Sequence, residues 1–488
     1  MMGVRAPQKD LFSYQVDLDK RVRAHHPLRA IQRQIDFTFV RAAVGRHYGY
    51  NGHKSEDPAV IAKMMFLLFY DDVSSERELM RIIAERMDYL WFLGYGLDDE
   101  IPNHSVLSKA RRRWGVEVFQ SFFMRIVSQC VAAGLVAGQK IHVDASLIAA
   151  NASTDSVVKG TPEWIAALKK AYQAAESKLD DTTTPGGRVG VNDQMLSTTD
   201  PDAGLTRIGP GQSRPRYHHH RVVDDAQGVI TAVETTSGSI AENKKLMALI
   251  DQHELNTART VETVVADNKY GTTENYVACQ QAGLTTHLGD VLAKQTDNPH
   301  CRGIFPDTLF THDAATNTYR CPGGHTLVAR RLHPRRHTWE YHTARGVCAA
   351  CALRQQCTRA TYGRTIKRHE HQELLDQARA QAHSRAAHRD RRRRMHLIEG
   401  SFADAANNHH FKRSRWRRLW RQQIQDYLIA AIQNVRILLK DRPRSGLLSG
   451  ISRQQASRRL LIAIPRLCGG ENVSVGRFIL DGGEWTFR

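Results

Sequence analysis

The sequence lacks any apolar run long enough to cross a lipid bilayer. A membrane-spanning helix needs about 20 consecutive apolar residues, whereas the best run here, residues 60–70, is short and interrupted by Lys63. The N-terminus also lacks the apolar core of a secretory signal, since Gln8, Lys9 and Asp10 break it early. We therefore expect a cytoplasmic protein.

Acidic residues are scarce relative to basic ones. The chain has 69 Lys and Arg against 50 Asp and Glu, a formal net charge of +19. Such a surplus indicates a polyanionic partner, although composition alone leaves a merely basic soluble protein equally open. Clustering favours nucleic acid, because residues 391–394 are all arginine and further basic residues crowd 412–421. We expect a DNA-binding protein that is associated with the nucleoid.

Cysteine is sparse as well, with 8 residues in 488, and in the cytoplasm these do not suggest a disulfide framework. Four lie close together as Cys321 and Cys348-x2-Cys351-x5-Cys357. A CxxC pair with two further cysteines can form a closed, tetrahedral zinc site that holds together a segment poor in apolar residues. Two alternatives stay open: His325 as the fourth ligand, or ordinary reduced thiols. The four cysteines outside this cluster are interpreted as buried or incidental thiols: Cys130, Cys279, Cys301 and Cys468.

The chain is too long for one small core, so several domains are expected. Apolar residues recur at helical spacing between 30 and 135, which predicts helices over 58–70 and 75–93 and a capped helix over 106–114. The charged face of this last helix could lie on DNA phosphates or simply face solvent; it comprises Lys109, Arg111, Arg112 and Arg113. We interpret residues 1–135 as an all-helical, DNA-binding N-terminal domain.

The pattern changes to strands at residue 139. Apolar and polar residues alternate over 140–145, and two strand-like runs flank a turn at 224–228, which predicts a hairpin. Further expected elements are helices over 163–180, over 241–253 and from 273, strands over 261–266 and 285–288, and a surface excursion over 181–216. This order predicts a mixed sheet with helices packed on it, over 136–295. His218, His219 and His220 cannot all face one metal ion, because successive strand residues alternate faces.

The remainder divides into three parts. Residues 296–368 interrupt the pattern and are interpreted as a cysteine-rich, zinc-binding insertion. Helical spacing resumes over 370–405 and 419–440, so residues 369–440 are expected to complete the sheet domain with helices. The tail, 441–488, carries no clear signal.

Three carboxylates stand in well-marked settings. Asp144 in KIHVDAS and Asp267 in TVVADNKYG each close a short apolar run that predicts a buried strand, and Glu399 in MHLIEGSF lies on an arginine-rich helix. Two acids at strand ends and one on a helix can converge on two Mg²⁺ ions, as phosphodiester cleavage and joining require. Taken singly, each acid is more often a turn former or a cap. The hypothesis of a catalytic triad therefore depends on their joint order.

Longer motifs surround these acids. HVDASLIAANAS, YHHHRVVDDAQGVITAVETTSGS, VVADNKYGTTENY and LIEGSFADAANNHHFKRSRWRRLWRQQIQDYLIAAIQNVRILL follow one another along the chain, after DPAVIAKMMFLLFYDDVSSERELM and IPNHSVLSKARRRW. In this order they resemble the transposases of bacterial insertion sequences that have a DDE active site, with their helical N-terminal domain. The resemblance covers residues 20–440.

The resemblance implies a ribonuclease-H-like α/β catalytic domain and Mg²⁺-dependent DNA cleavage and strand transfer. Asp144, Asp267 and Glu399 would be the catalytic acids and would hold two Mg²⁺ ions. The partners would be double-stranded DNA, as terminal inverted repeats and target, and a second copy of the chain in the active dimer. Two alternatives are a catalytically inactive DNA-binding derivative and a stand-alone metal-dependent nuclease on the same fold.

The basic residues around Glu399 depart from the pattern of some relatives, which carry a Tyr and an Arg on the turns before the Glu and a Lys after it. Here these positions hold Arg392, Met395 and Ala406. Arg392 shares a helix face with Glu399 and could contact phosphate, and Lys412 is a displaced substitute for the Lys. Together with Arg413 and Arg415, they are the expected DNA-binding residues of this region.

Overall fold

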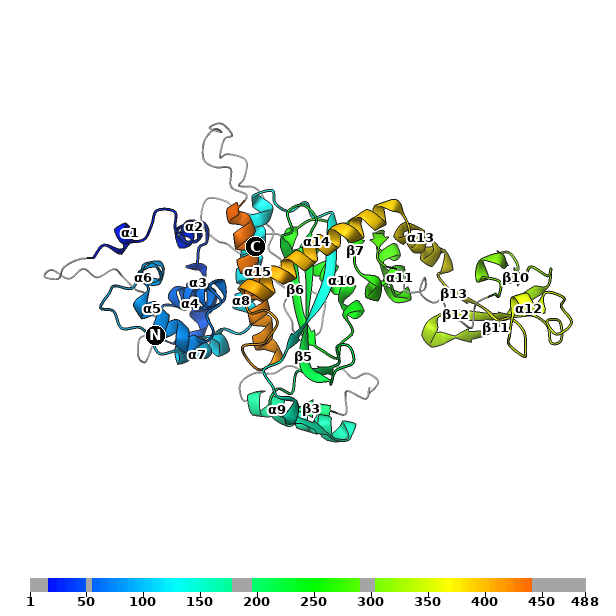
Figure 1. Cartoon of the computed structure of the whole chain (residues 1–488), viewed down its shortest axis with the longest axis horizontal. Coiled ribbons are helices and arrows are strands. Elements are labelled where there is room, and N and C mark those ends of the chain that lie inside the picture. The colour runs from blue at the N-terminus through cyan, green and yellow to red at the C-terminus, as the bar shows by residue number, and fades with distance from the viewer. Residues whose placement is uncertain (1–15, 50–54, 178–194, 290–302, 441–488) are drawn as a thin grey trace, which may run out of the picture. The chain divides into compact units, whose positions relative to one another are not determined.

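The computed structural model describes residues 16–49, 55–177, 195–289 and 303–440. Within these ranges the chain is a mixed α/β protein with a helical N-terminal region (Figure 1). No helix in the described ranges is both long and apolar enough to span a membrane. The tail and the thiols of Cys301 and Cys468 lie outside the described residues.

The N-terminal region contains the predicted helices. Helix α4 (Pro58–Tyr70) has the expected bounds, because Asp57 caps it through a hydrogen bond from the Ala59 amide to Asp57 Oδ1, 2.9 Å. The single helix expected over 75–93 is wrong, since Arg86 is extended (φ −110°, ψ 112°) and separates α5 from α6. The helices are α1 (Leu18–Arg21), α2 (Pro27–Gln34), α3 (Phe39–Val44), α4, α5 (Glu76–Glu85), α6 (Met87–Leu93), α7 (Ser105–Trp114) and α8 (Glu117–Ala132).

These helices share one hydrophobic core with elements from the far end of the sequence. Helix α15 (Leu419–Lys440) is buried around most of its surface. It packs on α8, where the rings of Phe123 and Tyr427 lie 5.6 Å apart, and Ile398 of α14 (Arg385–Asn408) belongs to the same buried cluster. The N-terminal helices therefore fold against the C-terminal ones rather than around a core of their own.

The central sheet is mixed, as predicted. Its strand order is β4-β5-β1-β7-β8, with β6 also paired to β5. Strand β1 runs antiparallel to β5 and parallel to β7. The strands are β1 (Lys140–Ala149), β4 (Gly204–Thr206), β5 (Arg214–Asp224), β6 (Ile230–Ser237), β7 (Thr263–Val265) and β8 (Thr285–His287). The prediction of a surface excursion over 181–216 is therefore wrong from residue 195 on. This part of the chain contains β3 (Met195–Ser197), β4 and the start of β5, and β3 pairs with β2 (Val157–Lys159).

Helices cover both faces of this sheet. Ile141 and Val143 of β1 belong to a buried cluster with residues of α10 (Leu246–Thr257) and α11 (Thr273–Gln281). The alternate residues of β1 face α14, where Lys140 Nζ lies 3.1 Å from Asp390 Oδ1. The histidine run follows the same rule: His219 contacts Asp426 on one face, whereas His220 bonds Thr236 on the other. The expected helix over 163–180 is α9 (Pro162–Ser177).

Amide side chains cover the outer edge of β6. Gln423 Oε1 accepts a hydrogen bond from the Thr235 amide at 2.6 Å, and Asn256 Nδ2 donates to the Thr231 carbonyl at 2.7 Å. Asn434 bonds both the amide and the carbonyl of Ile230. The backbone groups of this edge strand are thus satisfied by side chains of α10 and α15.

A second, antiparallel sheet carries the clustered cysteines, in the order β13-β12-β11-β10-β9. Its buried core is small and consists of Phe310, Tyr319, Leu327, Tyr341 and Ile366. The strands are β9 (Thr311–Asp313), β10 (Thr318–Arg320), β11 (Thr326–His333), β12 (Thr338–His342) and β13 (Ile366–His369). Helix α12 (Arg354–Cys357) lies between the last two strands, and α13 (Gln372–Ala382) follows β13.

Candidate active site and cysteine cluster

Asp144 lies in the middle of β1, on the face that α14 covers. Arg394 Nη1 of α14 lies 2.7 Å from Asp144 Oδ2, and the aspartate side chain is 21% exposed. Burial raises the pKa of Asp144 above its ordinary value; the Arg394 charge opposes the rise, and the carboxylates of Asp267 and Glu242 add to it. Asp144 therefore has an arginine and two other acids within electrostatic reach.

Asp267 lies beside Asp144 because their strands are parallel neighbours. His142 pairs with Val265 in the register of β1 and β7, and each aspartate follows two residues later. Asp267 caps the short turn η5 (Asn268–Tyr270), with Oδ1 accepting from the Lys269 amide at 2.9 Å. The structure therefore brings these two acids together, but only Asp267 follows the end of its strand. The strand end expected at Asp144 is wrong, because β1 continues to Ala149.

Glu242 is a third acid in this cluster, and no pattern in the sequence pointed to it. It begins the turn η4 (Glu242–Lys245) after β6 and is only 8% exposed. Its Oε1 lies 2.5 Å from Lys269 Nζ. Lys269 thus contacts both acids. Its ammonium group pairs with Glu242, and its backbone amide donates a hydrogen bond to Asp267.

The Tyr270 side chain is buried within electrostatic range of the three acids. It is fully buried, and its hydroxyl finds no hydrogen-bond partner among the described residues. Burial raises the pKa of Tyr270 well above its ordinary value, and Asp144, Glu242 and Asp267 raise it further. A buried hydroxyl without a partner is costly, so this group marks a place where a polar ligand would be stabilised.

Glu399 lies on the helix whose Arg394 contacts Asp144. It lies on α14, as predicted, but its side chain is exposed. At about 100° per residue it stands roughly 140° around the helix from Arg394, which contacts Asp144. Ser401, which accepts a hydrogen bond from the buried Arg221, lies on the Arg394 side. Glu399 therefore lies on a different, exposed face of α14 from Arg394.

Lys412 lies next to the acids. Its Nζ donates to Ser146 Oγ at 2.6 Å, and Ser146 is two residues beyond Asp144 on the same face of β1. Burial and the neighbouring Arg221 lower the pKa of Lys412, whereas Asp144 raises it. Lys412, interpreted from the sequence as a displaced substitute for the Lys of some relatives, thus reaches the candidate site.

Two of the predicted DNA-binding arginines are structural, and the prediction for them is wrong. Arg111 is 3% exposed, pairs with Glu76 and stacks on the Trp416 ring at 3.8 Å. Arg415 is largely buried and bonds Asp72 at 2.7 Å. Buried cations paired with acids cannot reach phosphates. The remaining candidates are at least partly exposed: Lys109, Arg112, Arg113, Arg392, Lys412 and Arg413.

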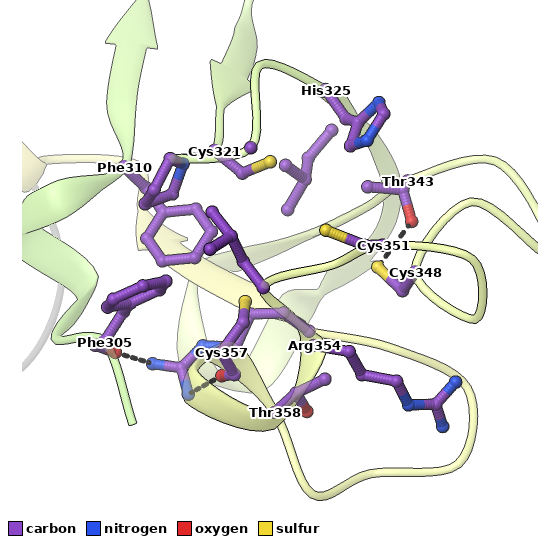
Figure 2. A pocket seen from close by; sticks show the side chains of 15 residues that line it. Phe305, Phe310, Cys321, His325, Thr343, Cys348, Cys351, Arg354, Cys357 and Thr358 are labelled. Carbon is purple, nitrogen blue, oxygen red and sulfur yellow. Dashed lines mark hydrogen bonds between the residues drawn. The ribbon is translucent and has the colours of Figure 1, made fainter. Parts of the chain in front are cut away.

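The four clustered cysteines line one pocket in the second sheet (Figure 2). Cys321 follows β10, Cys348 and Cys351 lie in the turns after β12, and Cys357 ends α12. Burial raises the pKa of the Cys357 thiol, and the other three thiols raise it further. Gly363 (φ +100°) passes over Cys348, where a Cβ would lie 2.8 Å from the sulfur. A side chain there would push the thiol aside.

His325 is less well placed for metal binding than the thiols. It lines the same pocket, but its side chain is exposed. In Figure 2 the sulfur atoms of Cys321 and Cys351 point toward the pocket, and Cys348 bonds Thr343. The arrangement favours four thiols over three thiols and the histidine.

Neither cluster is already arranged around an ion. In the described parts of the chain no group of three or more His, Cys, Asp or Glu side chains is disposed to hold a metal. At the acids the reason is visible: Arg394 engages Asp144, and Lys269 engages Glu242. Rotation of these side chains away from their cationic partners would be needed before a metal could bind.

Two family models match the chain. One, described as Transposase domain (DUF772), covers residues 16–113, and the other, described as Transposase DDE domain, covers residues 320–439. The second match contains Glu399, Lys412 and the four cysteines, whereas Asp144 and Asp267 lie between the two. No curated protein matches the chain.

Among solved structures the chain is similar to complexes of the Mos1 transposase. The paired-end complex with the left transposon end shares 10% identity at a TM-score of 0.16, covering 49% of this chain and 60% of that one. The strand transfer complex shares 11% identity at 0.15, covering 49% and 59%. The mariner paired-end complex with Mn shares 11% identity at 0.16, covering 55% and 70%. TM-scores this low do not establish a common fold.

Proposed function

We propose that the chain, which matches two transposase family models including a Transposase DDE domain, is a DDE transposase that cuts DNA at the ends of an insertion sequence and joins them to target DNA. The observation that carries the proposal is the position of Asp144 on β1 next to Asp267, which follows the end of the parallel neighbour β7, within a basic chain of net charge +19. The partners would be the terminal inverted repeats and the target duplex, held by a dimer because two ends must meet.

The catalytic domain would be ribonuclease-H-like, with residues 296–368 as an insertion in it. The mixed sheet supports this fold assignment: β1 lies between an antiparallel and a parallel neighbour, and helices cover both faces of the sheet. The second sheet follows β8 in the sequence and precedes α13 and α14, which return to the first sheet.

The acids fit Mg²⁺, which prefers carboxylate oxygens. Asp144 and Asp267 would hold it, and when bound it would activate the attacking oxygen and neutralise the leaving one. Arg394 and Lys269, freed from the acids, would be available to phosphate oxygens. Lys412 would hold a phosphate beside Ser146. The resemblance also assigns Glu399 to this set, and it would join the two aspartates from α14.

The test is a joining assay with oligonucleotides that carry the ends of the element, with Mg²⁺ present. We expect Asp144→Asn and Asp267→Asn to abolish both cleavage and joining while leaving DNA binding intact. Glu399→Gln decides whether that acid enters the site in the complex. Cleavage that persists in both Asp variants would overturn the proposal, and cleavage without joining or end specificity would favour a stand-alone nuclease.

The thiol cluster would hold a structural Zn²⁺. Four cysteine sulfurs suit a closed tetrahedral site, and the five buried residues of the second sheet make a core too small to hold these loops by itself. On binding, the four thiols would release their protons to solvent. No open ligand position is left for chemistry, so the metal would stabilise this segment only.

A further inference from the structure

We propose that the β11–β12 hairpin of the second sheet binds the phosphate backbone of duplex DNA through Arg330, Arg331 and Arg336. The inference rests on the proposed function, which makes DNA the partner, and it adds residues far along the chain from the candidate acids. Residues 314–339 contain no aspartate or glutamate, and Glu340 is the one acid of the hairpin sequence, 326–342. The short turn η9 (Pro334–Arg336) joins the two strands.

A bulge in β11 places two adjacent arginines on one face of the sheet. Ala329 pairs with Tyr341 and Arg331 pairs with Glu340, so Arg330 is the extra residue. Tyr341 is buried in the core of this sheet, and cross-strand partners share a face. Arg331, opposite Glu340, therefore lies on the other face, and Arg330 alternates with Ala329 to that same face. In a regular strand, alternation would turn Arg331 back toward the core.

The three arginines have no acidic partner. All three are exposed, and none of them forms an ion pair within the described residues. Glu340 lies opposite Arg331 but is engaged by other side chains: His333 Nε2 approaches it to 3.1 Å and Lys367 Nζ to 3.2 Å. Arg368 of β13, in contrast, pairs with an acid of α13. Exposed guanidinium groups without acids are suited to phosphate oxygens.

The alternative is that these charges only protect a strand edge. In the described structure β10 pairs with β11 over Thr326–Val328, so β11 is an edge from Ala329 on, and charges on an edge discourage pairing with another strand. A bulge protects an edge by itself, however, and Arg336 lies in η9, outside the strand. Phosphate binding accounts for all three positions, because a β-ribbon can lie in a DNA groove with its side chains on the backbone.

The salt dependence of DNA binding tests the hairpin. Fluorescence anisotropy measures the affinity of the full chain for an element-end duplex and for a scrambled duplex of equal length at several salt concentrations. We expect Arg331→Gln to reduce the slope of log affinity against log salt by about 0.9 with both duplexes, and replacement of all three arginines by glutamine to reduce it by about 2.7. Replacement by lysine should keep most of the slope, because the charge remains.

The matched control is Arg345→Gln, which removes one exposed charge from the turn after β12 and should keep the wild-type slope. A wild-type slope in the triple glutamine variant would assign the hairpin to solvent and overturn the inference. Equal reductions in Arg331→Gln and Arg345→Gln would also overturn it, since binding would then follow net charge. So would variants that bind duplex normally but lose binding to phosphatidylserine vesicles.

Failure of this inference can be told apart from failure of the proposed function. If the hairpin variants keep the wild-type slope while Asp144→Asn no longer cleaves DNA, the inference alone fails. If Asp144→Asn and Asp267→Asn still cleave while the hairpin variants lose slope, the proposed catalytic site fails and the hairpin remains a DNA-binding element.

Discussion

Arg394 Nη1 of α14 lies 2.7 Å from Asp144 Oδ2 in the middle of β1. The two side chains are 16% and 21% exposed, so the pair is held largely away from water. The Arg394 guanidinium thus pairs with Asp144, the first of the proposed catalytic acids. The same helix, α14, also carries Glu399. Metal binding at Asp144 must compete with this guanidinium.

Removing the competing cation should therefore tighten metal binding. We expect Arg394→Met to lower the Mn²⁺ dissociation constant by about three- to tenfold, roughly 1 kcal/mol. The matched control is Arg393→Met, since Arg393 bonds Asp225 at 2.6 Å, outside the acid cluster. Calorimetric titration measures both variants. Weaker binding in Arg394→Met would mean that the arginine orients Asp144 for the metal instead of competing with it.

Metal affinity should rise with pH through the pKa of Asp144, which burial holds above its ordinary value of 3.8. Only the ionised carboxylate binds metal, so affinity falls as pH drops below that raised pKa. Without metal, the pH dependence of folding stability has the opposite sign. The folded state binds the Asp144 proton more tightly than the unfolded chain does. The stability contributed by protonated Asp144 is therefore lost as pH rises through the pKa of the folded state. Mn²⁺ titrations across pH, with Arg394→Met shifting the midpoint upward, check the assignment. A flat profile would contradict it.

Arg111 should matter for stability and not for DNA binding. Arg111→Met leaves Glu76 without its buried partner and removes the stacking on Trp416, so we expect a destabilisation on the order of 3 kcal/mol. Thermal or urea unfolding measures it. Arg112→Met, one residue along on the exposed face, serves as the control and should unfold like the wild type. Equal stability of the two variants would contradict the buried role.

The exposed face of α7 should instead bind phosphates. Replacing Lys109, Arg112 and Arg113 by glutamine should reduce the slope of log affinity against log salt by about 0.9 for each phosphate that the helix no longer neutralises. Fluorescence anisotropy with a duplex at several salt concentrations gives the slope. An unchanged slope would assign this face to solvent, the alternative that its residue pattern allows.

Zinc should co-purify with the chain at about one ion per molecule if the four thiols act together. Cys351→Ser should lower the zinc content measured by atomic emission and destabilise the second sheet. Cys279→Ser, a buried thiol outside that sheet, is the control for removal of a cysteine. Zinc content that is equal in the two variants would contradict the site.

The sequence predicted the elements that have a strong local pattern. Helices α4 and α15 have the bounds that their apolar stretches indicated, and β7 ends just before Asp267 as expected, whereas β1 continues past Asp144 to Ala149. Local patterns did not reveal Glu242, because it lies in a turn without periodicity and meets the other acids only through the folding of η4 against η5.

Which basic residues are buried could also not be predicted from the sequence. Arg111 and Arg415 look like their exposed neighbours in the printed sequence, but their partners are Glu76, the first residue of α5, and Asp72, in the turn before that helix. Which arginine is enclosed depends on how α15 and its preceding loop pack against the N-terminal helices. That packing couples distant segments and leaves no local signature.

The covered edge of β6 restricts how copies of this protein can associate. A bare edge strand invites a strand from another molecule, but here Asn256, Gln423 and Asn434 already occupy its backbone groups. Two copies brought to high local concentration along one DNA molecule are thus kept from joining sheet to sheet at this edge. The pairing proposed for two copies would then have to use other surfaces, or the DNA that they share.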